Sequence, residues 1–391
     1  MKKKVRSFMF KFICLLIASN VTFSAWSVQP DKDLRKLRIA PTEEAFRDAL
    51  KTLAANGGGV ITFNVKNSFI DINDRIDYIG DNLTIDGEDR NNTFRYTGPD
   101  VFPSQIEGQD HLLRFFGDNN TLKNFTIYHF PEGVKAMSGN NILFENLKFP
   151  IVGEDAISVT GSGFVAFNVI IRNCYFENSE DKAIMINNGG SILVENCEFV
   201  NTTQPVRAGS QTGHYTIRNN IFRIDPARPQ HKRPDGNPRS SGPRFNGGNI
   251  DHIVIFENNT VIGTEYGIRI YGNVNAIIRN NTFENCNNGV LIFNTAKVRL
   301  IANKILNSVQ NGVTIQNTAR VDLGGGSVKI NGDSSPGRGG NIIKGNKAMD
   351  VVNESDNKVF SINNIWDHNK ADEVLHYDVT GNVIVEPLGS K

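Results

Sequence analysis

A short phrase that recurs along this 391-residue chain constrains its fold more than any other feature. Each copy alternates apolar and polar residues and then carries an asparagine and a further apolar residue, as in ILFENLKF and ILVENCEF. The asparagines of eight copies are Asn124, Asn146, Asn173, Asn196, Asn219, Asn258, Asn280 and Asn303, most of them 22 or 23 residues apart. A fixed period of this length indicates a solenoid built from one repeated unit.

The repeat unit reads as strands and turns. Its alternation is typical of β-strands, and asparagine tolerates the left-handed backbone of tight turns and can hydrogen-bond to its copies in neighbouring units. We therefore predict a single right-handed parallel β-helix, an all-β coil of ~22–23-residue rungs. The residues expected to stack inside it are Ile171, Phe176, Leu193, Phe199, Ile217 and Phe222. A leucine-rich or helical repeat is disfavoured because helical spacing is missing and β-branched residues are frequent.

The N-terminal segment has the pattern of an export signal. Lys2, Lys3, Lys4 and Arg6 precede an apolar run, and small residues at Ala25 and Ser27 follow it. We predict a signal peptide over residues 1–27 and a secreted protein, extracellular or periplasmic, whose β-helix domain spans 28–391. The apolar run is shorter than the about 20 residues that cross a bilayer, so we expect no membrane association after signal removal. An uncleaved N-terminal anchor is the alternative.

Three segments of the domain depart from the repeat. Residues 42–56 carry apolar residues at helical spacing, which predicts an N-terminal helix that caps the first rung. Residues 223–248 form a basic insertion rich in Pro and Gly, and residues 348–391 are expected to cap the other end of the coil.

Composition excludes some classes of protein. The formal net charge of +1 is too small for a protein that binds nucleic acid, so we expect no nucleic-acid partner. We also expect the protein to be a monomer. After the signal peptide only Cys174, Cys197 and Cys286 remain, so the chain is not a disulfide scaffold. Cys174 and Cys197 follow the repeated asparagine in adjacent rungs, where they are either bridged or stacked as free thiols.

Acidic residues occupy neighbouring rungs. Glu154 lies 22 residues after Glu132, one repeat further along the coil, and Asp155 follows it. Residues one repeat apart lie about 4.8 Å apart on the same face, and three carboxylates so close repel one another unless a cation or protons intervene. Oxygen ligands of this kind favour calcium. A solvated acidic patch is the alternative.

Basic residues occupy the rungs that follow. Lys182 and Arg207 come next along the same face, so that a calcium site beside them can hold an acidic sugar chain along the coil. The basic insertion contributes further cations that could overhang this cleft and attract a polyanion, among them Lys232, Arg233 and Arg244. A charged loop of this composition is also often merely solvated.

These motifs resemble those of the extracellular pectate lyases. VGEDAISV, EDKAIMI and PVRAGSQTGHYTIRNNIF are similar to that family's calcium, lysine and arginine motifs, over about a quarter of the chain. The resemblance implies calcium-assisted β-elimination on polygalacturonate or a related uronan. By the same resemblance Glu132, Glu154 and Asp155 bind calcium, Lys182 grips the substrate carboxylate and Arg207 is the base. Thr160 and Asp181 depart from the family pattern, where a basic residue and a histidine are usual.

The chemistry suits these residue types. The proton on carbon 5 of a uronide is hardly acidic until the adjacent carboxylate is neutralised, which calcium and Lys182 would do. Arg207 could instead only bind carboxylate. Two other functions remain open: a glycosidase of the polygalacturonase type, one motif of which GIRIYG at 267 faintly resembles, and a non-catalytic adhesin or carbohydrate-binding coil.

Overall fold

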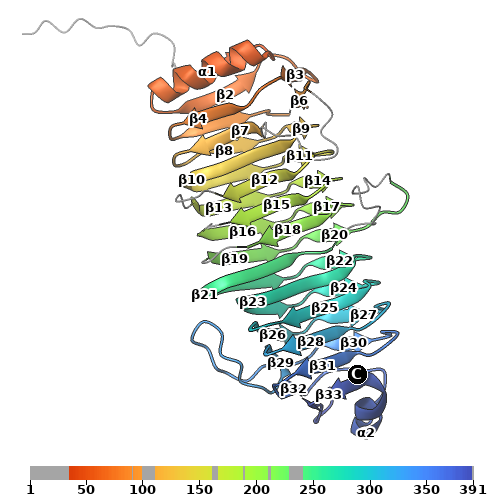
Figure 1. The fold of residues 1–391 in the computed structure, drawn as a ribbon. Helices are drawn as coiled ribbons and strands as arrows, with labels where there is room; N and C mark the ends of the chain where they lie inside the picture. Colours follow the sequence, from red (N-terminus) through yellow and green to blue (C-terminus); the bar gives the residue numbers. More distant parts are fainter. Residues whose placement is uncertain are drawn as a thin grey trace, which may run out of the picture. The chain divides into compact units, whose positions relative to one another are not determined.

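Short parallel strands stacked rung upon rung form a right-handed coil (Figure 1). The computed structural model describes residues 35–89, 91–98, 111–160, 166–187, 190–209, 213–228 and 241–389. The predicted signal peptide, Lys232 and Arg233 lie outside these residues. The described residues belong to one compact unit, Leu34–Lys391, and the β-helix prediction is confirmed.

Three faces run along the coil. Face A contains β4 (Ile76–Ile79), β7 (His111–Phe116), the first part of β10 (Glu132–Glu145), β12 (Asp155–Thr160), β15 (Lys182–Asn187), β18 (Gln204–Ala208), the first parts of β21 (Arg244–Glu257) and β23 (Tyr266–Arg279), β25 (Asn288–Phe293), β28 (Val313–Asn317), β31 (Val351–Ser355) and β33 (Val379–Gly381). Face B contains β1 (Lys36–Ile39), β2 (Gly59–Phe63), β5 (Leu83–Asp86), β8 (Thr121–Lys123), the later parts of β10, β21 and β23, and β13 (Ala166–Arg172), β16 (Ser191–Glu195), β19 (Gly213–Arg218), β26 (Lys297–Ile301), β29 (Arg320–Gly324), β32 (Val359–Ser361) and β34 (Val383–Ile384).

Face C is a separate sheet of 11 strands. Its members are β3 (Phe69–Ile72), β6 (Thr93–Tyr96), β9 (Thr126–Tyr128), β11 (Lys148–Phe149), β14 (Tyr175–Glu177), β17 (Glu198–Val200), β20 (Ile221–Arg223), β22 (Thr260–Ile262), β24 (Thr282–Glu284), β27 (Lys304–Leu306) and β30 (Ile342–Lys344). Because every pairing between these strands is parallel and follows chain order, residues one rung apart in sequence become neighbours in space.

Helix α1 (Glu43–Ala55) lies at the first rungs, as Figure 1 shows. The Thr42 side chain accepts a hydrogen bond from the Ala45 N–H, and buried Phe46 packs 5.0 Å from the ring of Phe94. The helix therefore shields apolar side chains that the open end of the coil would expose. At the other end, β31 to β34 continue the coil within the region predicted as a cap, together with α2 (Ala371–Glu373) and the π-helix η1 (Val374–Asp378). No helix among the described residues is long and apolar enough to cross a membrane.

A column of phenylalanine rings runs through the core. Phe149, Phe176, Phe199 and Phe222 stack nearly parallel, with centroids 5.1, 4.8 and 4.7 Å apart. Burial of each ring stabilises the fold by about 1.5–3 kcal/mol. Of the predicted core residues only Leu193 was wrong: it points partly outward, because Ile192 and Val194 are the buried positions of that strand.

The repeated asparagines serve two different purposes. The first seven of the predicted series adopt a left-handed backbone with φ between 52° and 65°. Asn303 does not, because Ala302 holds the left-handed position in that rung. Asn303 belongs instead to a fully buried ladder one residue further along each rung, whose members are Asn220, Asn259, Asn281, Asn303, Asn341 and Asn364.

In this buried ladder, each amide hydrogen-bonds to the next. The Nδ2 of each asparagine donates to the Oδ1 of the following one, at 2.9–3.1 Å. Cys197 and Cys174 fill the equivalent position in earlier rungs, and their thiols donate to Ile171 O and Phe144 O. Both cysteines are free, which decides between the two predicted alternatives.

On the outside of the coil, arginines pair with acids of the preceding rung. Six such pairs, with N···O distances of 2.5–2.9 Å, are Arg95–Asp71, Arg114–Asp77, Arg172–Glu145, Arg218–Glu195, Arg223–Glu198 and Arg279–Glu257. Exposed pairs stabilise by only up to about 1 kcal/mol each, but they show how this coil normally arranges stacked charge.

Candidate functional site

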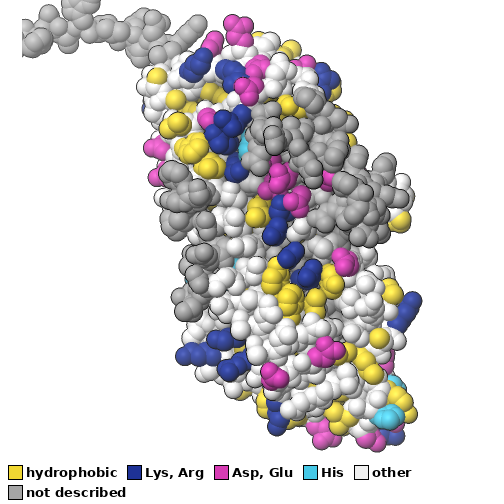
Figure 2. Space-filling view, in the orientation of Figure 1, with side chains coloured by type: hydrophobic (Ala, Val, Ile, Leu, Met, Phe, Trp, Pro, Cys, Tyr) yellow, Lys and Arg dark blue, Asp and Glu magenta, His cyan; other side chains and the backbone are white. Residues whose placement is uncertain are grey.

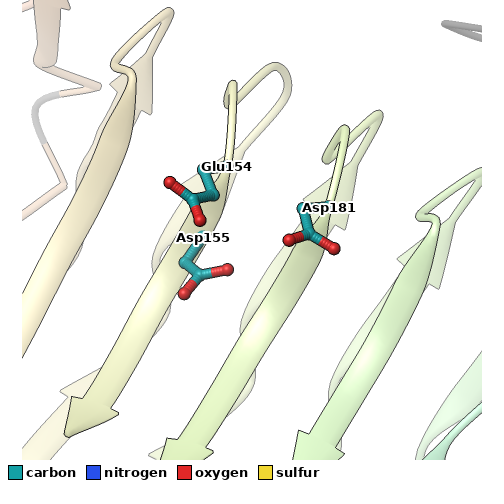
Figure 3. Close-up of side chains that lie close together, drawn as sticks. All are labelled: Glu154, Asp155 and Asp181. Atoms are coloured by element: carbon teal, nitrogen blue, oxygen red, sulfur yellow. The ribbon is translucent and has the colours of Figure 1, made fainter. Parts of the chain in front are cut away.

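Three carboxylates meet at the start of two neighbouring strands of face A. Glu154 and Asp155 lie where β12 begins, and Asp181 lies one residue before β15 (Figure 3). Each contributes an oxygen to a group in which all three atoms lie within 4.8 Å of one another. We call Glu154, Asp155 and Asp181 the acidic group.

Lys182 lies against this group. Asp155 and Lys182 are direct partners in the parallel pairing of β12 and β15, and the Lys182 Nζ lies 3.1 Å from Asp155 Oδ1. The same ammonium contacts the Asp181 carboxylate, and Lys182 is only 4% exposed. In this structure Lys182 is therefore held by two carboxylates of its own chain.

One ammonium does not balance this much negative charge. Burial, followed by the neighbouring carboxylates of Asp155 and Glu132, raises the pKa of Glu154 to about 7. Burial also raises the pKa of Asp155 to about 6, although Lys182 opposes the shift. Burial lowers the pKa of Lys182, but Asp155 and Asp181 outweigh it and leave that pKa raised. The group is thus electrostatically suited to take up a proton or a cation.

Glu132 is close to the acidic group, but its carboxylate is otherwise engaged. Val134 pairs with Ile157, which brings Glu132 level with Asp155. The 22-residue spacing predicts that Glu132 is level with Glu154, so the observed register differs by one residue. Its Oε2 lies 2.5 Å from His111 Nε2 and 3.7 Å from Lys135 Nζ. Burial raises the pKa of Glu132, but the hydrogen bond from His111 and the nearby cations leave it lowered. The structure therefore groups Asp181, rather than Glu132, with Glu154 and Asp155.

Three arginines follow one another along the same face. Arg207 of β18, Arg244 of β21 and Arg269 of β23 are successive partners in the parallel pairing, about 4.8 Å apart at the backbone. Arg207 lies one rung beyond Lys182 but level with Met185, three residues further along the strand. It is half-buried, and its side chain has no hydrogen-bond or ion-pair partner in the described part of the chain. We call Arg207, Arg244 and Arg269 the arginine column.

Aromatic rings support this column. The Arg244 guanidinium lies 5.0 Å from the Tyr271 ring centroid, and its Nε donates to Tyr271 Oη at 2.6 Å. Arg269 lies 4.7 Å from the ring of Tyr266, and Tyr271 stacks on Phe293 at 4.7 Å. Aromatic faces beside guanidinium groups suit a ligand that combines sugar rings with carboxylates.

Sequence reasoning missed part of this site. Arg269 and Tyr271 lie in GIRIYG, whose only signal in the sequence is a faint likeness to another enzyme class, and Asp181 stands out there only as a departure from a family pattern. Arg244 was assigned to the basic insertion, but it is the first residue of strand β21. Figure 2 shows acidic and then basic side chains following one another along the middle of this face.

The donor set of the acidic group fits calcium. It offers only carboxylate oxygens, close together, and burial raises the pKa of two of the three groups, Glu154 and Asp155. Hard oxygen donors without nitrogen or sulfur are the preferred ligands of Ca²⁺. A second group of three carboxylates, Asp350, Asp367 and Asp378, lies near the C-terminal end of the coil, where His368 Nδ1 lies 2.7 Å from Asp378 Oδ1.

Comparison with known proteins identifies the family. The family model described as the right handed beta helix region matches residues 112–224 and 240–386, more than half of the chain. The chain belongs to the right-handed β-helix family. This membership establishes the fold and leaves the reaction to be argued from the site.

Three similar proteins have names that describe enzymes acting on polysaccharides. A probable rhamnogalacturonase E of Aspergillus niger is 32% identical over 111 residues, 27% of this chain and 24% of that protein, so the match spans about a quarter of the relative. The catalytic unit of a GH87 α-1,3-glucanase from Streptomyces thermodiastaticus superposes with a TM-score of 0.57 at 12% identity, covering 89% of this chain and 67% of that one. An endo-xylogalacturonan hydrolase from Aspergillus tubingensis gives 0.49 at 13% identity, covering 88% and 96%. The likeness to the glucanase supports the fold alone.

Proposed function

We propose that this protein is a secreted polysaccharide lyase that cleaves a pectate-like polyuronate by calcium-assisted β-elimination. The observation that carries the proposal is the order of charges along face A: the acidic group with Lys182, then the arginine column. A polyanion lying along the coil would meet a cation-binding group and then three arginines in successive rungs.

The residues divide into two functions. Glu154, Asp155 and Asp181 would hold calcium, which supplies positive charge beside the substrate carboxylate next to carbon 5. Lys182 adds a buried ammonium at the same place and keeps the carboxylates of the acidic group in position. Both effects favour the developing negative charge at carbon 5.

Arg244 and Arg269 bind and orient the polymer. Their planar guanidinium groups can each take a carboxylate in a bidentate manner, and the rings beneath them hold the side chains in place. Successive uronate residues would thus be fixed relative to the acidic group, which removes much of the entropic cost of reaching the transition state.

Arg207 lies at the junction of the two parts and has no partner within the described chain. It either takes the proton from carbon 5 or binds the carboxylate of the reacting sugar. On elimination, the C–H electron pair forms the double bond between carbons 4 and 5, and the bond from carbon 4 to the glycosidic oxygen breaks with its electrons on that oxygen. The oxygen then takes up a proton, so the products are one unsaturated and one saturated chain end.

A glycoside hydrolase is the second candidate, favoured by the raised pKa of Glu154. A carboxylic acid with a pKa of about 7, close to two other carboxylates, has the properties of a general acid paired with a base or nucleophile. The name of the rhamnogalacturonase relative, of which this chain matches about a quarter, points the same way.

One assay separates these functions. The purified protein is incubated with polygalacturonate and with alginate, with calcium or with a chelator, and both ultraviolet absorbance and reducing ends are followed. A lyase produces new absorbance from the unsaturated ends, and the chelator abolishes it. Reducing ends without absorbance would replace the lyase proposal by the hydrolase, and neither signal together with retained polymer binding would leave a carbohydrate-binding coil.

A further inference from the structure

Four cations line one pocket on face B, away from the candidate site. Lys297 of β26 is the direct pairing partner of Arg320 of β29, and both line a pocket of about 450 Å³ with Lys358. Lys329, from the loop between β29 and β30, lines the same pocket. We call Lys297, Arg320, Lys329 and Lys358 the basic pocket. In Figure 2, Lys and Arg side chains gather at the left of the lower half, beside the loop that Figure 1 shows there.

The basic pocket breaks the charge pattern of the coil. On the outside of the coil, outside the arginine column, arginines such as Arg218 and Arg279 pair with an acid of the preceding rung, Glu195 and Glu257. Within the described ranges, none of the four pocket cations has an ion pair or a side-chain hydrogen bond. Like charges on directly paired strands repel and destabilise a sheet. A bound anion would relieve this repulsion.

The rest of the lining suits a sugar. Phe360 presents an aromatic side chain at the same pocket, and Asn357 presents its amide oxygen, since its Nδ2 donates to the carbonyls of Thr318 and Ala319. A neighbouring pocket of about 210 Å³ shares Lys297 with Asn273, Asn275 and Thr295. Aromatic, amide and hydroxyl groups beside cations can bind ring faces, hydroxyls and carboxylates together. The volume lies in the range of pockets that hold small ligands.

We propose that the basic pocket is a second, non-catalytic binding site for an acidic polysaccharide, in which a segment of uronan lies along β26, β29 and β32. A uronan carries one carboxylate on every sugar, so a segment can meet the stacked cations one after another. The pocket lies on face B at the C-terminal rungs, whereas the candidate site lies on face A at β12 to β23, so one chain could be held at both places. The choice of a uronan rests on the proposed function, but the need for an anion does not.

The test is calorimetric titration of the full-length protein with a short oligogalacturonate in the presence of a chelator, which prevents calcium-dependent turnover. The variant K297Q/R320Q/K358Q removes the stacked charges at exposed positions that have no ion-pair or side-chain hydrogen-bond partner among the described residues. The wild type is expected to bind at two sites, and the variant is expected to lose one of them or to bind there at least about tenfold more weakly. The matched control K148Q/K304Q/K344Q makes the same change of charge on face C and should bind like the wild type.

The results also separate this inference from the proposed function. If no polysaccharide is cleaved but the variant still loses a binding site, the lyase proposal fails and the basic pocket stands. If cleavage occurs and the variant binds with unchanged stoichiometry and affinity, the inference is overturned. Equal weakening in the control variant would also overturn it, since net charge rather than the pocket would then hold the polymer. Binding of inorganic phosphate with the same dependence on the three cations, but no binding of oligogalacturonate, would reject the uronan.

Discussion

The buried asparagine ladder gives the sharpest test of how this coil is held together. Asn281 makes four side-chain hydrogen bonds: its Nδ2 donates to Phe256 O and Asn303 Oδ1, and its Oδ1 accepts from the N–H and the Nδ2 of Asn259, at 2.8–3.1 Å. Each bond contributes about 1 kcal/mol, and Asn281→Ala also leaves the buried Asn259 N–H without its acceptor. We expect a loss of about 4–5 kcal/mol in the free energy of unfolding, measured by urea denaturation.

Asparagines that stack on the outside of the coil, Asn82, Asn119 and Asn141, supply the matched control. Asn141 also stacks on a copy 22 residues earlier, but its hydrogen bond to Asn119 is solvent-exposed and its φ of 56° is one that glycine adopts freely. Asn141→Gly should therefore cost less than about 1 kcal/mol. The double variant N259A/N281A should cost clearly less than the sum of its single variants, because the two residues share bonds. Equal losses for Asn281→Ala and Asn141→Gly would refute the claim that burial gives the ladder its value.

The remaining predictions concern the charged groups. Arg207→Gln should lower the turnover rate about 100-fold or more without changing the urea midpoint, because the side chain has no partner to lose among the described residues. Arg207→Lys keeps the positive charge but not the planar guanidinium, so a larger loss in KM than in turnover would indicate that the residue binds carboxylate. Tyr271→Phe removes the hydroxyl that accepts from Arg244 and should raise KM severalfold at nearly constant turnover, and a fall in turnover alone would contradict a binding function. Calcium should raise Tm in the wild type and much less in Asp181→Asn, as followed by thermal denaturation with a chelator as reference. Burial raises the pKa of Asp350 from 3.8 to about 8, so the folded state holds a proton that the unfolded state has lost between these values, and stability should fall as pH rises across that window. The free energy of unfolding should fall by at most about 5 kcal/mol across this window in the wild type. With a chelator present for both proteins, this fall should be absent in Asp350→Asn, and parallel pH profiles of the two proteins would contradict the prediction.

The fold could be predicted from the sequence because each repeat carries the same short pattern of apolar residues and asparagine. The 22–23-residue period predicted the coil, and the left-handed asparagines at Asn124 to Asn280 match the turns. The period could not say which of two adjacent asparagines, such as Asn280 and Asn281, turns the chain and which enters the core. In each of these rungs the left-handed residue directly precedes the buried asparagine, so the choice depends on the register of the strands against the core, and a shift by one residue exchanges the inner and outer faces.

The same limit explains what was missed at the site. Counting 22 residues aligns Glu132 with Glu154, but the strand pairing aligns it with Asp155, and the residue that completes the acidic group is Asp181, on the following strand. Arg269 lies two strands of face A beyond Arg207, and the basic insertion between them breaks the repeat, so the sequence spacing does not align the two arginines. The pairing of Lys182 with its two carboxylates depends on side-chain direction, which the repeat does not specify.

The parallel register has a consequence for how such a groove can change over evolutionary time. Each element of the candidate site comes from one short, contiguous stretch of chain, and neighbouring stretches are separated by one strand spacing of about 4.8 Å. Duplication or deletion of a whole repeat between β15 and β18 would leave the phenylalanine column and the turns intact, yet move Arg207 relative to the acidic group by a fixed step. The reach of the groove is therefore adjustable only in increments of one coil, and variants that differ by such a step would be expected to accept chains of different length or linkage.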